Sequence, residues 1–136
     1  MLPFEFNVDG PPVSQQARRQ ERIVAWKMSV KSKAAERWPK DAPPVDQDVS
    51  IEITHFFEGA PADVDNIAKP ILDAIKGLVY VDDRQVSDLV CRRRPLEGPF
   101  RADSVSTTLA EGLTGNREFL HIRIIAASQD GELKFL

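Results

Sequence analysis

The segment from residue 63 to residue 83 constrains the fold more than any other, because it joins a helix-forming apolar stripe to a set of carboxylates. Its apolar residues recur at the spacing of one helix face: Ile67, Ile71, Ala74, Ile75 and Leu78. Its polar residues fall on the other side of that projection: Asp65, Asn66, Lys69, Asp73 and Lys76. One face should therefore pack against a core, while the other faces water or performs chemistry.

The two ends of this short helix can be placed from single residues. Pro70 lacks a backbone N–H and its ring disturbs the preceding turn, so regular helix should begin close to Ile67 or Lys69, or be kinked there. Asp63 and Asp65 would then lie on the entry loop. Gly77 is a natural C-terminal stop.

The chain after the helix is long enough to return to its start. A helix of about ten residues is only ~15 Å long. An extended segment from Leu78 to Val81 could therefore carry Asp82 and Asp83 back toward Asp63 and Asp65. We expect these four carboxylates to converge at one end of the helix.

Four carboxylates at one point repel one another unless a cation is present. A cluster without His or Cys favours Mg²⁺, or Mn²⁺ as a substitute, over Zn²⁺. The predicted metal ligands are Asp63, Asp65, Asp82 and Asp83. A simpler interpretation stays open, in which the aspartates cap the helix and form a turn while Lys69 makes a salt bridge to Asp65 or Asp73.

The remaining pattern indicates an α+β fold, with a mixed sheet of about four strands on which a long basic helix and the short motif helix pack. Expected strands are 2–8, 49–57, 86–94 and 120–126, and the long helix is expected from Ser14 to about Arg37. The length of 136 residues suits one domain, residues 1–136. Residues 97–118 are expected as a loop or flexible excursion with a short helix near Ser106 to Glu111.

The long helix should be two-sided. Its apolar stripe is predicted to be Ala17, Val24, Met28 and Ala35. The opposite face would carry Trp26 with a set of basic residues: Arg18, Arg19, Arg22, Lys33 and Arg37. The net charge of −3 is thus unevenly distributed, and this face is either simply solvated or a surface for phosphates.

Three further side chains have modest expected roles. His55 lies in the apolar phase of its strand, which favours a packed or hydrogen-bonded structural residue, although it could also support the aspartate site. His121 is expected to be an exposed strand residue. Cys91 is interpreted as a small packed residue, because no histidine is placed to activate it as a catalytic thiol.

No run of residues reaches the ~18 apolar positions of a membrane span, and Met1 to Glu5 lacks the pattern of a signal peptide. We therefore expect a cytoplasmic protein without a membrane partner.

The ordered set Asp-x-Asp-Asn-x-x-Lys-Pro-x-Leu-Asp-Ala-x-Lys-Gly, followed by Asp-Asp-x-Gln, resembles the signature of the RusA family of Holliday-junction resolvases, which are crossover-junction endodeoxyribonucleases. The resemblance is close from Asp63 to Gln85. The opening Gly10-Pro11-Pro12-Val13-Ser14-Gln15 and the order of strands extend it to about Arg94.

The resemblance implies a RusA-like homodimer that binds four-way DNA junctions and makes paired, Mg²⁺-dependent nicks in DNA recombination and repair, close to the nucleoid. By position, Asp63, Asp65 and Asp83 would be the essential metal-binding carboxylates, and Lys69 the essential lysine. Asp82 would support them. Asp73 also fits the pattern, but a structural ion pair explains it equally well.

Phosphate contacts are expected from the long helix and from the third strand, at Arg18, Arg19, Arg22, Arg92 and Arg94. One alternative is a catalytically inactive or prophage-derived DNA-binding module of the same fold. Another is a nucleotide-sugar transferase that uses Asp-x-Asp and Mn²⁺, which a short chain without a nucleotide-binding unit does not favour.

Overall fold

The computed structural model describes residues 2–14, 17–128 and 130–133, and it contains four strands, three α-helices and one 3₁₀ turn within them. In chain order these are β1 (Phe4–Asp9), α1 (Gln20–Arg37), β2 (Val49–Phe57), α2 (Val64–Ile75), η1 (Asp83–Gln85), β3 (Val86–Pro95), α3 (Thr107–Thr114) and β4 (Phe119–Ala126). None of these helices is long and apolar enough to cross a bilayer.

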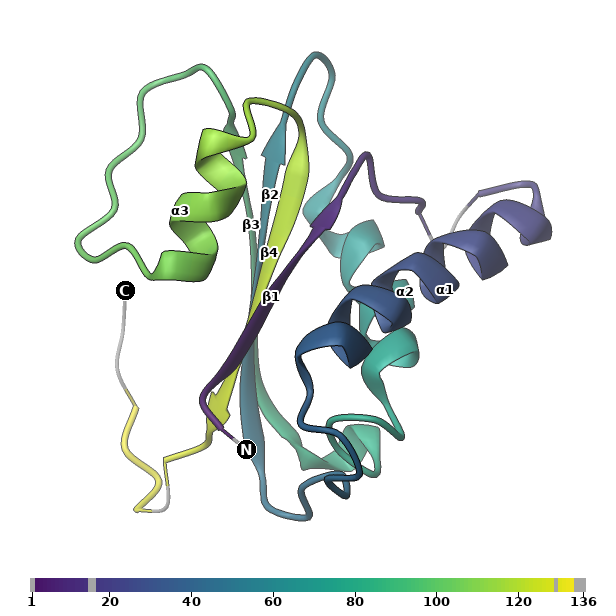
Figure 1. Cartoon of the computed structure of the whole chain (residues 1–136), viewed down its shortest axis with the longest axis vertical. Coiled ribbons are helices and arrows are strands. Elements are labelled where there is room, and N and C mark those ends of the chain that lie inside the picture. Colours follow the sequence, from purple (N-terminus) through teal and green to yellow (C-terminus); the bar gives the residue numbers. More distant parts are fainter. Residues whose placement is uncertain (1, 15–16, 129, 134–136) are drawn as a thin grey trace.

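The strands form one mixed sheet in the order β1-β4-β2-β3. Strand β4 runs antiparallel to both β1 and β2, whereas β2 and β3 are parallel. Helices α1 and α2 pack side by side on one face of the sheet, and α3 lies on the other (Figure 1). The predicted α+β fold with a four-stranded mixed sheet is confirmed, with α3 as a third helix.

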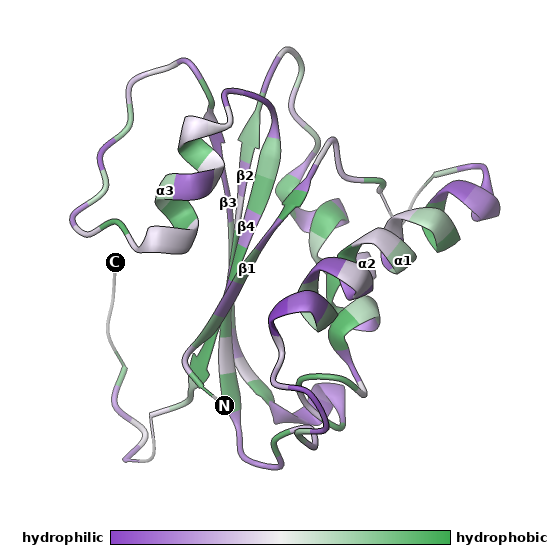
Figure 2. Cartoon of the chain, viewed as in Figure 1, coloured by the Kyte–Doolittle hydropathy of each residue, from purple (hydrophilic) through white to green (hydrophobic). Residues whose placement is uncertain are grey.

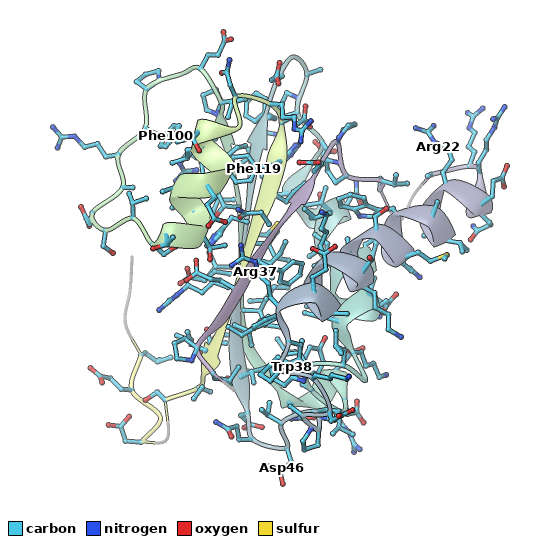
Figure 3. All side chains as sticks on the ribbon, viewed as in Figure 1. Arg22, Arg37, Trp38, Asp46, Phe100 and Phe119 are labelled. Carbon is cyan, nitrogen blue, oxygen red and sulfur yellow. The ribbon has the colours of Figure 1, made fainter. Side chains whose placement is uncertain are left out.

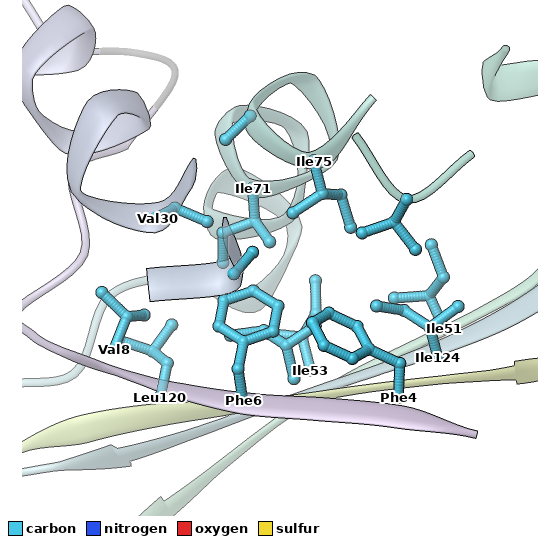
Figure 4. Close-up of a cluster of buried hydrophobic side chains, with 14 of the residues drawn as sticks. Phe4, Phe6, Val8, Val30, Ile51, Ile53, Ile71, Ile75, Leu120 and Ile124 are labelled. Carbon is cyan, nitrogen blue, oxygen red and sulfur yellow. The ribbon is translucent and has the colours of Figure 1, made fainter. Parts of the chain in front are cut away.

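The core lies between the sheet and the pair α1 and α2. Apolar and polar residues alternate along β1 and β2 (Figure 2), so these strands, with β4, turn a buried apolar row toward the two helices. Figure 4 shows that cluster, in which the strand residues Phe6, Ile53 and Leu120 meet Val30 and Ile71 from the helices. This shared burial determines which face of each helix is turned inward.

Helix α1 uses a different face from the predicted one. Its buried residues are Ile23, Trp26, Val30 and Ala34, whereas Val24 is 54% and Met28 67% exposed. The stripe that contains the Trp26 indole buries more apolar surface than the predicted stripe, and the stabilisation gained by burial increases with apolar area. Trp26 therefore belongs to the core and not to the basic face.

The start of α1 also differs from the prediction. The helix begins at Gln20, with Arg19 at the N-cap position, so Ser14 is not its cap. The carbonyl of Ser14 instead accepts a hydrogen bond from the N–H of Ala17, at 3.0 Å. Residues 15 and 16 lie outside the described part of the chain.

The short helix expected near Ser106 to Glu111 is α3. Ser106 caps it by accepting the N–H of Leu109 at 3.1 Å, and Asn7 on β1 donates to the carbonyl of Thr108 at 2.7 Å. A side chain at Gly112 would lie 2.2 Å from the Phe119 ring, so the close approach of α3 to β4 requires glycine there.

His121 is buried, which corrects the prediction of an exposed strand residue. It lies on the sheet face that α3 and the chain before it cover, and its Nε2 is 2.7 Å from Oε1 of Glu5. Alternation along β4 correctly placed it away from the main core. A helix that packs on the second face is a tertiary feature that alternation does not report.

The corrected face of α1 can be tested with one substitution at two sites. Val30→Ala removes two buried methyl groups and should lower the free energy of unfolding by about 2 kcal/mol. Val24→Ala makes the same change at an exposed site of the same helix and should stay within ~0.5 kcal/mol. Urea denaturation measures both, and equal losses would contradict the assigned face.

Candidate functional site

Helix α2 presents the first half of the aspartate motif. It begins at Val64, with Asp63 at the N-cap and Asp65 in the first turn, so it starts earlier than the predicted Ile67 or Lys69. Pro70 lies inside the helix and is buried. The helix loses one hydrogen bond there, but packing of its apolar face stabilises it across that position.

Asp63 and Asp65 are exposed, and within the described residues neither carboxylate has a hydrogen-bonding or ion-pair partner. Negative charge is favourable at the N-terminus of a helix, where the backbone N–H groups point outward. The fold tolerates both charges at this end of α2 and leaves their oxygens available to a ligand.

The end of α2 is a tight turn and not the extended return segment predicted for Leu78 to Val81. Lys76 is the C-cap, Gly77 follows with φ of +87°, and its N–H donates to the carbonyl of Tyr80 at 2.7 Å. The N–H of Val45 donates to Val79 at 2.8 Å. This pairing with the chain before β2 draws the turn inward.

Asp82 shapes the next turn, η1. Its carboxylate accepts the N–H of Arg84 at 3.3 Å, and the Arg84 guanidinium lies against it at 3.1 Å. These donors, the backbone N–H first, lower the pKa of Asp82. Gln85 accepts the N–H of Asp82 at 2.8 Å and donates to the carbonyls of Val45 and Gln47, which fixes the turn beside β2.

Asp83 and Lys69 meet in a row of alternating charges along α2. Lys69 Nζ lies 2.8 Å from Asp73 and 3.6 Å from Asp83. Lys27 of α1 lies 3.3 Å from Asp73, and Lys76 lies 4.0 Å from Asp83. The structural ion pair expected for Asp73 is confirmed, and Lys69 is the residue that connects it to Asp83.

These contacts shift two pKa values in opposite directions. Partial burial alone would raise the pKa of Asp73, but hydrogen bonds and charge from Lys69 and Lys27 outweigh it and lower the pKa. The hydrogen bond to Asp73, with the charges of Asp73 and Asp83, raises the pKa of Lys69. Lys69 therefore stays a cation at neutral pH.

Tyr80 holds Asp83 in place, and sequence reasoning missed it. Its fully buried ring brings the hydroxyl within 3.1 Å of the Leu72 carbonyl and 3.3 Å of Asp83 Oδ1. Burial, followed by the negative charge of Asp83, raises the Tyr80 pKa, so the group stays a neutral donor. The available signal was a tyrosine three residues before the aspartate, within an apolar run.

The structure does not bring the four carboxylates to one point. Among the described residues, no group of three or more His, Cys, Asp or Glu side chains is placed to hold a metal ion. In the parallel pair of β2 and β3, Phe57 aligns with Pro95 and Val49 with Val86. Asp63 therefore follows one end of this pair while Asp83 precedes the other, and α2 spans the distance between them (Figure 1).

The expected basic residues lie on both sides of the sheet. Arg18, Arg19 and Arg22 are exposed near the start of α1, and Figure 3 shows Arg22 at this end of the helix. Arg92 and Arg94 line a pocket on the opposite face, beneath α3. The two groups therefore do not form one continuous surface.

Arg93 is the basic residue of β3 that points toward the aspartate motif; the arginine run at the end of this strand is expected to contact phosphates, with at most two of the three on one side. Its guanidinium donates to the carbonyl of Ala62 at 3.3 Å, just before Asp63. The structure agrees with this alternation, because Arg92 and Arg94 share the other face of the sheet.

His55 and Cys91 have structural surroundings. His55 is 1% exposed, and its Nε2 lies 2.6 Å from Glu118, which also accepts the N–H of Glu58 at 3.1 Å. The histidine thus ties the end of β2 to the start of β4, as expected of a hydrogen-bonded structural residue. Burial raises the pKa of the Cys91 thiol to about 11, against a smaller opposing effect of Arg92, which argues against a nucleophile.

Comparison with known proteins gives one family match. The family model described as "Endodeoxyribonuclease RusA" matches residues 9–106, a stretch from the end of β1 to the cap of α3 that includes the whole aspartate motif. No curated protein matches the chain significantly.

The charge row predicts a pH-dependent contribution to stability. Because the folded-state pKa of Asp73 is lowered, its stabilisation is present above the ordinary aspartate pKa of about 3.9 and is lost as pH falls through the folded value. Asp73→Asn should therefore lower the free energy of unfolding at neutral pH, by up to about 1 kcal/mol for such a partly exposed pair.

Urea denaturation of wild type and Asp73→Asn across pH measures this difference, which should shrink as pH falls below the ordinary aspartate pKa and vanish once Asp73 is protonated in the folded protein. Asp46→Asn, at an exposed loop position, should change stability at neutral pH by less than ~0.5 kcal/mol. A difference for Asp73→Asn that persisted in acid would contradict the ion-pair origin.

Proposed function

The chain belongs to the RusA family of endodeoxyribonucleases, and we propose that it resolves four-way DNA junctions by divalent-metal-dependent hydrolysis of two phosphodiester bonds. The observation that carries the proposal is the arrangement along α2. Asp65 lies one helical turn before Lys69, and Lys69 contacts Asp83 at 3.6 Å.

By donor chemistry, four carboxylates without His or Cys suit a hard divalent cation such as Mg²⁺, with Mn²⁺ as a substitute, although this structure keeps the two aspartate pairs apart. Asp63, Asp65 and Asp83 would hold it through carboxylate oxygens, and Asp82 would support them. Asp63 and Asp65 are exposed and have no side-chain partner in the part of the chain that the structure describes, and Asp83 is half-exposed, so their oxygens are accessible. When bound, the cation would activate water and neutralise charge on the phosphate.

Lys69 is proposed to neutralise the scissile phosphate. It is a cation at neutral pH, its side chain is half-exposed, and its present partners are carboxylates. A phosphate oxygen could replace either partner, because exposed ion pairs contribute little stability. The simpler role as a salt-bridge residue predicts that removing Lys69 would spare cleavage.

DNA is proposed to approach from the side of the two helices. Arg18, Arg19 and Arg22 extend from α1, which packs against α2, and Arg93 lies beside the start of α2. Two cuts on a symmetric junction require two sites, which a homodimer supplies. Such an enzyme would act in recombination and repair of DNA in the cytoplasm, at the nucleoid.

A second candidate is an inactive DNA-binding module of the same family fold. The separation of Asp63 and Asp65 from Asp82 and Asp83 favours it, since no three carboxylates of the described residues form a cation site. The same cleavage experiment distinguishes the two candidates.

With Mg²⁺, the purified protein should cut a synthetic four-way junction symmetrically and leave linear duplex largely intact. Asp65→Asn should lower the cutting rate by on the order of 100-fold or more, because it removes a charged metal ligand, while junction affinity measured in EDTA stays unchanged. Asp46→Asn makes the same chemical change at the far tip of the molecule (Figure 3) and should cut normally.

Equal cutting by Asp65→Asn and wild type would refute the metal site. If the wild-type protein bound the junction without cutting it, the second candidate, an inactive DNA-binding module, would be favoured. Duplex cut as readily as junctions would reduce the activity to that of a general endonuclease.

A further inference from the structure

A pocket of about 650 Å³ lies on the sheet face away from α1 and α2. Its floor comes from outward residues of all four strands, and its wall from the chain at 100–106 and Leu109 of α3. Asp63, Asp65 and Asp83 do not line it. It is therefore a feature separate from the aspartate motif, on the opposite side of the sheet.

The floor is charged because two rows of cross-strand neighbours bring ionisable side chains together there. Arg123 on β4 pairs in register with Glu5 on β1 and Glu52 on β2, and Thr54 on β2 pairs with Arg92 on β3. Four arginines line the pocket against three carboxylates: Arg92, Arg94, Arg101 and Arg123 against Glu5, Glu52 and Asp103. The excess charge is positive.

Two of the carboxylates already have partners. Glu5 accepts hydrogen bonds from Ser106 at 2.5 Å and lies 2.7 Å from His121. Burial alone would raise the Glu5 pKa, but these bonds, with the charge of Arg123, lower it, so Glu5 stays ionised. Glu52 lies 3.6 Å from Arg92.

The other arginines of the pocket have no carboxylate within salt-bridge distance among the described residues. Arg94 donates only to the backbone carbonyl of Arg93, at 2.8 Å, and neither Arg101 nor Arg123 forms an ion pair there. Guanidinium groups without carboxylate partners around one hollow are suited to bind phosphate oxygens, because their planar donors match that geometry.

An aromatic side chain completes the site. Phe100 is half-buried at the pocket wall, with its ring centroid 5.3 Å from Phe56, which in turn stacks on Phe119 at 4.8 Å. Figure 3 shows Phe100 and Phe119 beside α3. A supported aromatic ring beside cations is the usual means by which proteins bind single strands without sequence preference.

We propose that this pocket binds one unpaired nucleotide of a nucleic-acid strand, with arginines on its phosphates and Phe100 stacked on its base. The volume lies within the roughly 300–1,000 Å³ typical of small-ligand sites, which suits a single nucleotide and excludes a duplex. The site goes beyond the proposed junction function, because the bases of a four-way junction can all be paired, and binding here does not depend on cleavage.

The test is fluorescence anisotropy of a labelled oligothymidylate of about ten nucleotides, in EDTA so that no cleavage occurs. The double variant Arg94→Gln with Arg101→Gln should weaken binding on the order of tenfold. It should also reduce the magnitude of the slope of log K against log salt by about 1.4, which is the contribution of two phosphate contacts on a single strand. Phe100→Leu should weaken binding by a similar factor with an unchanged salt slope.

The matched control is Lys40→Gln with Arg117→Gln, which removes the same charge at exposed sites outside the pocket and should change affinity less than about twofold. Thermal unfolding must show that all variants are folded. Equal weakening by the control pair, or no binding by wild type, would overturn the proposal.

Competition experiments identify the ligand. If inorganic phosphate or thymidine monophosphate competed at the same concentration as the oligonucleotide, the pocket would be a site for free phosphate instead. If duplex DNA bound equally well, the proposal of an unpaired nucleotide would be refuted. Asp65→Asn should bind the oligonucleotide as wild type does, so loss of cleavage and loss of this site are separate outcomes.

Discussion

The parallel pairing of β2 with β3 is the constraint on which the rest of the structure depends. Parallel neighbours need a crossover that travels the full length of the strands, and here that crossover is α2. Burial of its apolar face, including Ile67, Ile71 and Ile75, stabilises the connection and orients the polar face outward. The entry to α2 and the turn η1 are consequently held at the two ends of the strand pair.

The charge row along the outer side of α2 follows from this placement. Lys69, Asp73 and Asp83 lie within one network because the turn after Gly77 folds η1 back beside the helix and Tyr80 anchors Asp83. Exposed ion pairs of this kind add little to stability. Their effect is to hold Lys69 and Asp83 beside each other on the outer side of α2.

The sheet separates two surfaces of different character. The face toward α1 and α2 is a closed apolar core, while the other face carries polar pairs such as Glu5 with His121 beneath α3. Gly112 allows that helix to approach, and the space left beside it is the arginine-lined pocket.

Alternation and helical periodicity in the sequence by themselves determined the α+β class, the strands 49–57 and 86–94 and the apolar side of α2, because local burial patterns record which side of an element meets a core. The same reasoning misjudged α1, where two stripes were possible and only packing against the sheet selected the one with Trp26. It also predicted that Asp63 and Asp65 converge with Asp82 and Asp83. Whether they do depends on the relative direction of β2 and β3, and that direction is set by pairing between distant segments. The positions of Arg93 and His121 were likewise decided by tertiary structure, since each depends on which distant segment covers its face of the sheet. That of Tyr80 depends on the turn that folds it back onto Leu72 and Asp83.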